Sequence, residues 1–279
     1  MAKERKQPRY IESELKQPML NYHVYYMSAS EILFYNTLLL FGGGFVGVIL
    51  FGGLFKQDGI ATKMTFISNI VVFLIVGVIA NRVFIKQVNI SLRNKRDQKL
   101  QKQFVDLLQI LVTALSTGNT LQQSFEIARK ELMNQYVAQD MIVKEVSEIV
   151  RCTNNGITLE SSLENFGKRS NNDDIVNFVN IISTCKRLGG DFKEVIFRTK
   201  TIIVDKIAIQ NEINTKTTSN QLQLKAMSAM PILLVAMLKT GSSQFAENLA
   251  KPIGIIATAI ASVLFVVSYI WGRKIIDIR

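Results

Sequence analysis

Residues 118–125 read GNTLQQSF, and residues 156–163 read GITLESSL. Both segments begin with glycine, have threonine and leucine at the third and fourth positions, and close with a serine and a large apolar residue. Glycine can adopt the left-handed conformation that ends a helix. The threonine hydroxyl can then accept hydrogen bonds from the free amides of the next helix. Each segment therefore predicts a junction between two helices.

A looser third copy, GGDFKEV, lies at residues 189–195. Thr120 with Gln123, and Asp191 with Glu194, have the spacing of a capping box. One such segment is ordinary turn chemistry that arises by chance in helical proteins. Its recurrence, each time before an amphipathic helix, favours a repeated helical architecture. The junction residues are Gly118, Thr120, Leu121, Gly156, Thr158, Leu159, Gly189, Gly190 and Asp191.

Apolar residues around these junctions recur with helical spacing, and no stretch keeps the alternation of a strand. Six stripes can be followed, beginning with Phe104, Leu107 and Leu108 and ending with the long series from Phe192 to Ile213. No proline occurs between Pro18 and Pro231 to interrupt them. Short connections make neighbouring helices antiparallel. The region therefore predicts an antiparallel bundle of about six helices.

Four segments are almost free of charge, at residues 33–55, 64–80, 226–238 and 253–271. A membrane-spanning helix needs about 20 apolar residues, and only the third segment is clearly short. It contains Pro231 and can still span if the flanking Lys225 and Lys239 reach toward the head groups, or if the bilayer thins locally.

The predicted fold is all-α: a cytosolic bundle flanked by two transmembrane helical hairpins, with four spans and both termini cytosolic. The expected divisions are a cytosolic tail at 1–31, the first hairpin at 32–85, the bundle at 86–220, and the second hairpin with a short cytosolic C-terminus at 221–279.

The orientation follows from a basic cluster beside the second span. The cluster consists of Arg93, Lys95, Arg96, Lys99 and Lys102. Basic residues next to spans favour the cytoplasmic side, and Arg273, Lys274 and Arg279 place the C-terminus there too. The formal net charge of +11 also makes nucleic-acid binding an alternative interpretation of this cluster. The cluster abuts a span and has no interleaved aromatic residues, so attraction to anionic lipid head groups explains it more simply. We expect a multi-pass protein of the cell membrane.

Small residues recur four apart in two spans, as Gly43 with Gly47 and Ala257 with Ala261. This spacing lets helices approach closely and is typical of an assembly seam. Spanning helices are also rich in glycine for other reasons, so both interpretations stay open.

No catalytic or cofactor site can be assembled from the residues. One histidine, His23, and two cysteines, Cys152 and Cys185, cannot build a zinc site. The cysteines are expected to be reduced and to pack as small apolar residues. Asp173 and Asp174 suit the first turn of a helix. There is no phosphate-binding glycine loop. We expect neither an enzyme nor a bound cofactor.

The order of these motifs resembles a known family. The repeated junctions followed by Leu188 to Phe192 are similar to the type II secretion system F domain. A single copy between two hairpins resembles the platform proteins of the tight-adherence (Tad) pilus. The closing residues 271–276, WGRKII, are similar to the end of the B-type member. Phe192 and Lys193 depart from the family, which often has leucine and a small residue there.

The resemblance implies an inner-membrane platform of a pilus or secretion machine. Such proteins sit above a cytosolic hexameric ATPase, which is a separate chain, and help to lift pilin subunits from the bilayer. Related platform proteins usually carry two F domains, so a second F-domain protein or a homo-oligomer is implied here. One alternative is a membrane-anchored signalling or scaffold protein with a helical interaction domain. A small transporter is another, although charges inside the spans are nearly absent.

Overall fold

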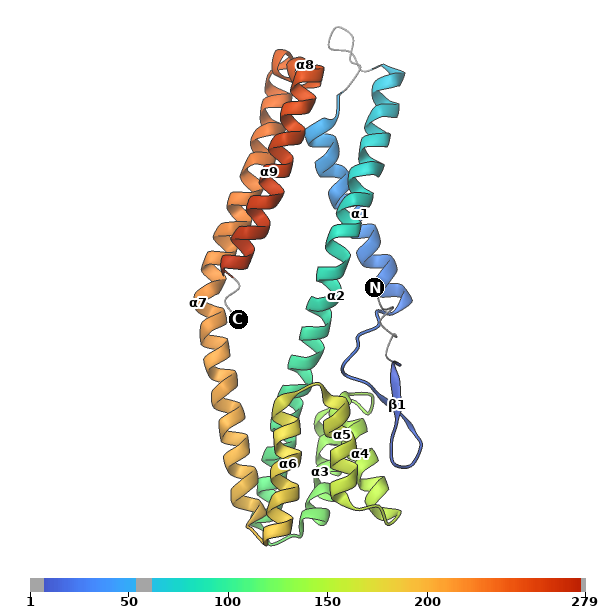
Figure 1. The fold of residues 1–279 in the computed structure, drawn as a ribbon, viewed down its shortest axis with the longest axis vertical. Coiled ribbons are helices and arrows are strands. Elements are labelled where there is room, and N and C mark those ends of the chain that lie inside the picture. The colour runs from blue at the N-terminus through green and yellow to red at the C-terminus, as the bar shows by residue number, and fades with distance from the viewer. Residues whose placement is uncertain (1–7, 54–61, 277–279) are drawn as a thin grey trace, which may run out of the picture. The chain divides into compact units, whose positions relative to one another are not determined.

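The computed structural model describes residues 8–53 and 62–276. In this part of the chain there are nine helices and two three-residue strands, so the all-α prediction is confirmed (Figure 1). Most of the expected turn of the first hairpin, at residues 56–63, and Arg279 lie outside the described residues. The helices are α1 (Ala29–Phe51), α2 (Lys63–Ser116), α3 (Leu121–Gln135), α4 (Met141–Asn154), α5 (Leu159–Ser170), α6 (Asp173–Leu188), α7 (Phe192–Gly241), α8 (Ser243–Ala250) and α9 (Pro252–Ile276).

The chain divides into two compact units. The described residues of the first are 8–26 and 89–209, and those of the second are 27–53, 62–88 and 210–276. The long helices α2 and α7 contribute residues to both. The N-terminal residues belong to the same unit as the bundle, a grouping that the sequence did not suggest.

The first unit is a helical bundle made of the C-terminal part of α2, helices α3 to α6, and the N-terminal part of α7. This agrees with the prediction of about six helices. Its core takes one face of α2, where Leu100, Phe104 and Leu107 are at most 1% exposed. The rings of Phe104 and Phe178 meet edge to face, with centroids 5.3 Å apart. Burying each such side chain contributes about 1.5–3 kcal/mol.

The N-terminal residues form a small hairpin in the same unit. Strands β1 (Tyr10–Glu12) and β2 (Pro18–Leu20) pair antiparallel, with Tyr10 opposite Leu20. Two three-residue strands are too short to be stable alone. The hairpin is therefore stabilised by its contacts with the bundle, which are described below.

The second unit contains α1, the N-terminal part of α2, the C-terminal part of α7, and helices α8 and α9. Four of the described helices are long and apolar enough to cross a membrane: α1, α2, α7 and α9. Their apolar side chains are widely exposed, including Leu33 at 71% and Leu264 at 65%. A water-soluble monomer rarely exposes so much contiguous apolar surface, so these faces suit lipid or another apolar partner.

The helices after the bundle include a proline inside α7 and a short capped helix, α8. Helix α7 continues through Pro231, although proline cannot donate a backbone hydrogen bond. The polar stretch between α7 and α9 contains α8, whose first turn is capped by the Ser242 hydroxyl accepting from the Phe245 amide at 3.2 Å.

Candidate functional site

The first two helix junctions have the geometry that the sequence predicts. Gly118 and Gly156 both have a φ of +83°, in the left-handed region that residues with a side chain rarely adopt. Thr120 begins α3 with a complete capping box, in which Gln123 bonds back to the threonine amide at 2.9 Å. Thr158 caps α5 by accepting from the Ser161 amide at 3.3 Å.

These caps also bury the leucines and serines of the repeated motif. Leu121 and Leu159 are each 9% exposed, and both lie at the edge of the core. Ser124 and Ser162 are buried and donate to the carbonyl oxygens of their capping threonines, at 2.9 and 3.1 Å. In both copies the motif therefore starts a helix and places its first turn against the core.

The third junction is built differently. Gly189 has a φ of +70° and ends α6, and the Gly190 amide donates to the Cys185 carbonyl oxygen at 2.9 Å. The Asp191 carboxylate accepts from the amide two residues ahead, at Lys193, at 2.8 Å. Glu194, the expected partner of Asp191 in a capping box, instead accepts from Arg198 at 2.6 Å.

The basic cluster is partly committed to contacts within the first unit. Lys99 pairs with Asp140 at 2.5 Å, and this hydrogen bond holds the pKa of the Asp140 carboxyl below its usual value. Arg93 and Arg96 both pair with Asp97, at 3.8 and 3.0 Å. The other two members, Lys95 and Lys102, have exposed side chains.

A buried ion pair lies between α4 and α5. The Arg169 guanidinium donates to both carboxylate oxygens of Glu145, at 2.9 and 2.7 Å. The side chains are only 3% and 1% exposed. This two-point geometry is the strongest arrangement for an arginine and a carboxylate. Removing charges from water is costly, so breaking one half of such a pair leaves the other highly unfavourable.

The N-terminal residues complete this buried site. The Tyr22 hydroxyl donates to Glu145 at 3.0 Å, and the Tyr22 amide donates to the Arg169 carbonyl oxygen at 2.9 Å. The Arg96 guanidinium lies over the Tyr22 ring, 5.5 Å from its centroid, and donates to the Val24 carbonyl oxygen at 2.8 Å. Tyr22 is 1% exposed. Burial, with Glu145 beside it, raises the pKa of Tyr22 well above its usual value, which keeps the hydroxyl a donor.

The β-hairpin of β1 and β2 makes its own contact with α4, next to this buried site. The Ser13 hydroxyl donates to Glu148 at 2.5 Å, and Arg151 pairs with the other oxygen of the same carboxylate at 2.5 Å. Cys152 lies beside them at 1% exposure, and burial, followed by the charge of Glu148, raises the pKa of its thiol. We name Tyr22, Glu145, Arg169, Glu148 and Ser13 the tail-docking cluster.

None of the residues of the tail-docking cluster was singled out from the sequence. One signal was present. Glu145 falls between Ile142 and Ile149 in the core stripe of α4, three residues after the first and four before the second. A carboxylate at such a position requires a buried partner, but spacing alone does not identify Arg169, which lies 24 residues further on.

The small residues Gly43 and Gly47 of α1 pack against α2 of the same chain. A Cβ atom added at Gly43 would lie 2.5 Å from the Ala80 Cβ, and one added at Gly47 would lie 2.7 Å from the Val76 Cβ. These glycines therefore allow α1 and α2 to approach closely. Ala257 and Ala261 of α9 are exposed.

Lys239 lies at the end of α7 and donates to the carbonyl oxygens of Leu50 and Gly52, at 3.0 Å each. These groups stand at the C-terminus of α1, where unpaired carbonyls carry partial negative charge that a cation stabilises. Within the described residues, no group of three or more histidine, cysteine or acidic side chains could hold a metal ion.

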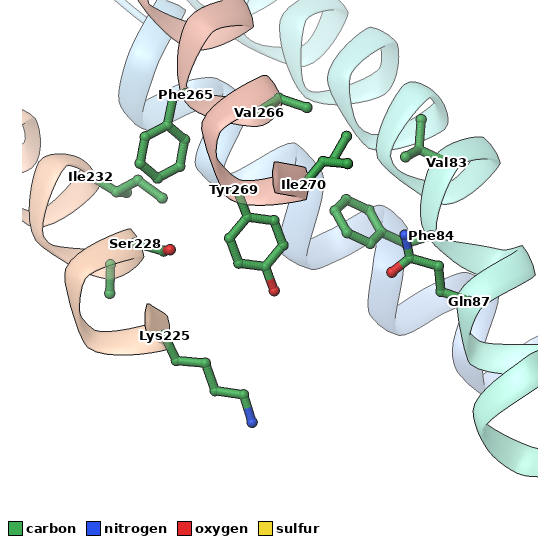
Figure 2. A pocket seen from close by; sticks show the side chains of 11 residues that line it. Val83, Phe84, Gln87, Lys225, Ser228, Ile232, Phe265, Val266, Tyr269 and Ile270 are labelled. Atoms are coloured by element: carbon green, nitrogen blue, oxygen red, sulfur yellow. The ribbon is translucent and has the colours of Figure 1, made fainter. Parts of the chain in front are cut away.

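An apolar pocket of about 360 Å³ lies within the second unit, lined by residues of α2, α7 and α9 (Figure 2). Phe84 comes from α2, Ile232 from α7, and Phe265 from α9. Polar groups on its lining include Lys225 and Tyr269.

Residues 107–239 match the family model described as type II secretion system (T2SS), protein F. This part of the chain carries a type II secretion system F domain. The match begins within the buried face of α2, covers all three helix junctions, and ends at Lys239. No curated protein and no solved structure matches the chain. Members of the F-domain family are non-enzymatic inner-membrane platform proteins of type II secretion and pilus-assembly systems.

Proposed function

We propose that this F-domain protein is the inner-membrane platform of a Tad or type IV pilus-like assembly machine, and that it couples a cytosolic ATPase to the extraction of pilin subunits. The observation that carries the proposal is the F domain at residues 107–239 in a chain with four helices able to span a membrane. The position of the F domain between two pairs of apolar helices, together with residues 271–276, supports the Tad type.

In this proposal the bundle faces the cytosol and binds the ATPase through its charged surface. Movement of the bundle passes along α7, which runs without interruption from Phe192 to Gly241. Pilin subunits leave the bilayer beside the spans. A second F-domain protein, or a second copy of this chain, completes the platform.

Membrane topology gives the first test. The Glu164→Cys variant places a thiol on the exposed surface of α5, and Glu247→Cys places one on exposed α8. The native cysteines are buried, at 1% for Cys152 and 7% for Cys185, so they add little background. A membrane-impermeant maleimide should label Glu247→Cys in intact cells, and should label Glu164→Cys only after the membrane is opened. Labelling of Glu164→Cys in intact cells would overturn the topology.

Partner binding gives the second test. The full chain, solubilised in mild detergent from its own host, should co-purify with the secretion ATPase and a second F-domain protein. Deleting its gene should abolish pili while leaving pilin in the membrane. If the protein binds neither partner and pili still form in the deletion strain, the platform function is refuted.

A further inference from the structure

The apolar pocket of the second unit has a polar end and an apolar end. On α7, Lys225 comes two turns before Ile232, about 10 Å along the helix axis. On α9, Phe265 comes one turn before Tyr269. Figure 2 shows the Tyr269 hydroxyl and the Lys225 side chain pointing the same way, away from Ile232 and Phe265.

The polar end coincides with the cytoplasmic side of the proposed topology. Helices α2 and α9 would run inward, so Gln87 and Tyr269 lie toward their inner ends. Helix α7 would run outward, so Lys225 lies at its inner end. Tyrosine is enriched at the membrane interface, and lysine favours its cytoplasmic side. Gln87, Lys225 and Tyr269 thus all lie toward the cytoplasmic side in this topology.

Lys225 gives this end of the pocket a positive charge. None of the residues lining the pocket is acidic, and in the described part of the chain no ion pair forms at Lys225, whose side chain is exposed. A ligand that fits must therefore combine an anionic group at the inner head-group level with an apolar body reaching toward the middle of the bilayer.

The size of the pocket and its apolar lining suit an acyl chain. Its volume of about 360 Å³ is within the range of small-ligand pockets, roughly 300–1,000 Å³. A linear acyl chain is thin and apolar and suits this space, and a protein helix as occupant is a separate outcome of the test below.

We propose that this pocket binds an anionic phospholipid of the inner leaflet, with its phosphate at Lys225 and an acyl chain against Phe84, Ile232 and Phe265. The proposal rests on the membrane placement within the proposed function, and it does not require the ATPase or the pilin. The lipid would fill the space between three spans and so hold the second hairpin to the first.

The test uses the full chain purified in mild detergent. The protein is incubated with equal amounts of phosphatidylglycerol and phosphatidylcholine, and bound lipids are counted by native mass spectrometry. The wild type should prefer phosphatidylglycerol, and Lys225→Gln should reduce that preference about five-fold, the effect of one lysine near an anionic surface. Lys86→Gln removes an exposed charge from α2 that does not line the pocket, and it should leave the preference unchanged. Equal losses in both variants would overturn the proposal.

A second pair of variants tests the apolar part. Ala229 lines the pocket and Ala226, on the same helix, does not. Ala229→Phe should displace the bound lipid, and Ala226→Phe should keep it. A photoreactive amino acid placed at Ala229 in host membranes should form an adduct with lipid. An adduct with another polypeptide instead would show that a protein helix occupies the pocket and would overturn the inference. The topology labelling at Glu164 and Glu247 separates either result from a failure of membrane placement.

Discussion

Replacing Arg169 with methionine should severely destabilise the bundle. Methionine is an unbranched apolar side chain that fills part of the space of the arginine stem. It leaves the Glu145 carboxylate, which is 1% exposed, without its cation. Removing one partner of a buried ion pair costs about 3–5 kcal/mol. The free energy of unfolding of a typical domain is only about 5–15 kcal/mol. The change should therefore increase opening of the bundle by roughly a hundred-fold to a few thousand-fold.

The buried thiol of Cys185 on α6 provides the assay. It is 7% exposed, so it reacts when the bundle opens. Its rate of labelling in the full chain, measured in detergent under conditions where closing is fast, reports the population of the open state. The expected result is a rise in that rate of at least a hundred-fold for Arg169→Met.

Arg151→Met is the matched control. Arg151 also pairs with a glutamate of α4, Glu148, but its side chain is 44% exposed. Exposed pairs contribute about 0–1 kcal/mol, so labelling should rise no more than about five-fold. The Glu145→Met/Arg169→Met double variant removes both buried charges and should label more slowly than Arg169→Met alone. Similar rates for the two single variants, or a double variant worse than Arg169→Met, would refute the reasoning.

Three further predictions concern other parts of the chain. Gly156→Ala should cost about 1–2 kcal/mol because alanine is strained at a φ of +83°, which the same thiol-labelling assay would measure. Gly47→Leu should force α1 away from Val76, at a cost of about 1–3 kcal/mol. It should reduce disulfide cross-linking between cysteines introduced into the two helices, and unchanged cross-linking would contradict the packing. Burial, and then the hydrogen bond to Asp106, raise the pKa of Tyr136 to about 12. Its stabilising contribution is therefore complete below pH 10 and is lost as the pH rises toward 12, and the absorbance difference between wild type and Tyr136→Phe should titrate near that value.

The helical junctions were predictable because their chemistry is local. A glycine at positive φ followed by a capping threonine needs only the residues within one turn, and the sequence at Gly118 and Gly156 contains them all. The third junction shows the limit of this reasoning. The spacing of Asp191 and Glu194 suited a capping box, but an arginine one turn ahead competes for the glutamate.

The docking of the N-terminal residues was not predictable, because it depends on contacts between residues far apart in the sequence. The segment around Tyr22 has no apolar periodicity, and its partner Glu145 lies 123 residues away. The basic cluster was interpreted from charge alone, and charge does not distinguish an arginine facing lipid from one that holds Tyr22. The spacing of Gly43 and Gly47 left open whether a helix packs against them, and spacing does not identify which helix approaches.

Pro231 gives α7 a site near its C-terminus where the helix can bend. In an α-helix the amide of residue 231 would donate to the carbonyl oxygen of Met227. Proline has no amide hydrogen, so this carbonyl oxygen has no helical donor. Bending there sacrifices no main-chain hydrogen bond, whereas bending elsewhere in the helix does. A push delivered along α7 would therefore be converted at Pro231 into a tilt of the segment from Pro231 to Gly241, rather than into a displacement of the whole helix.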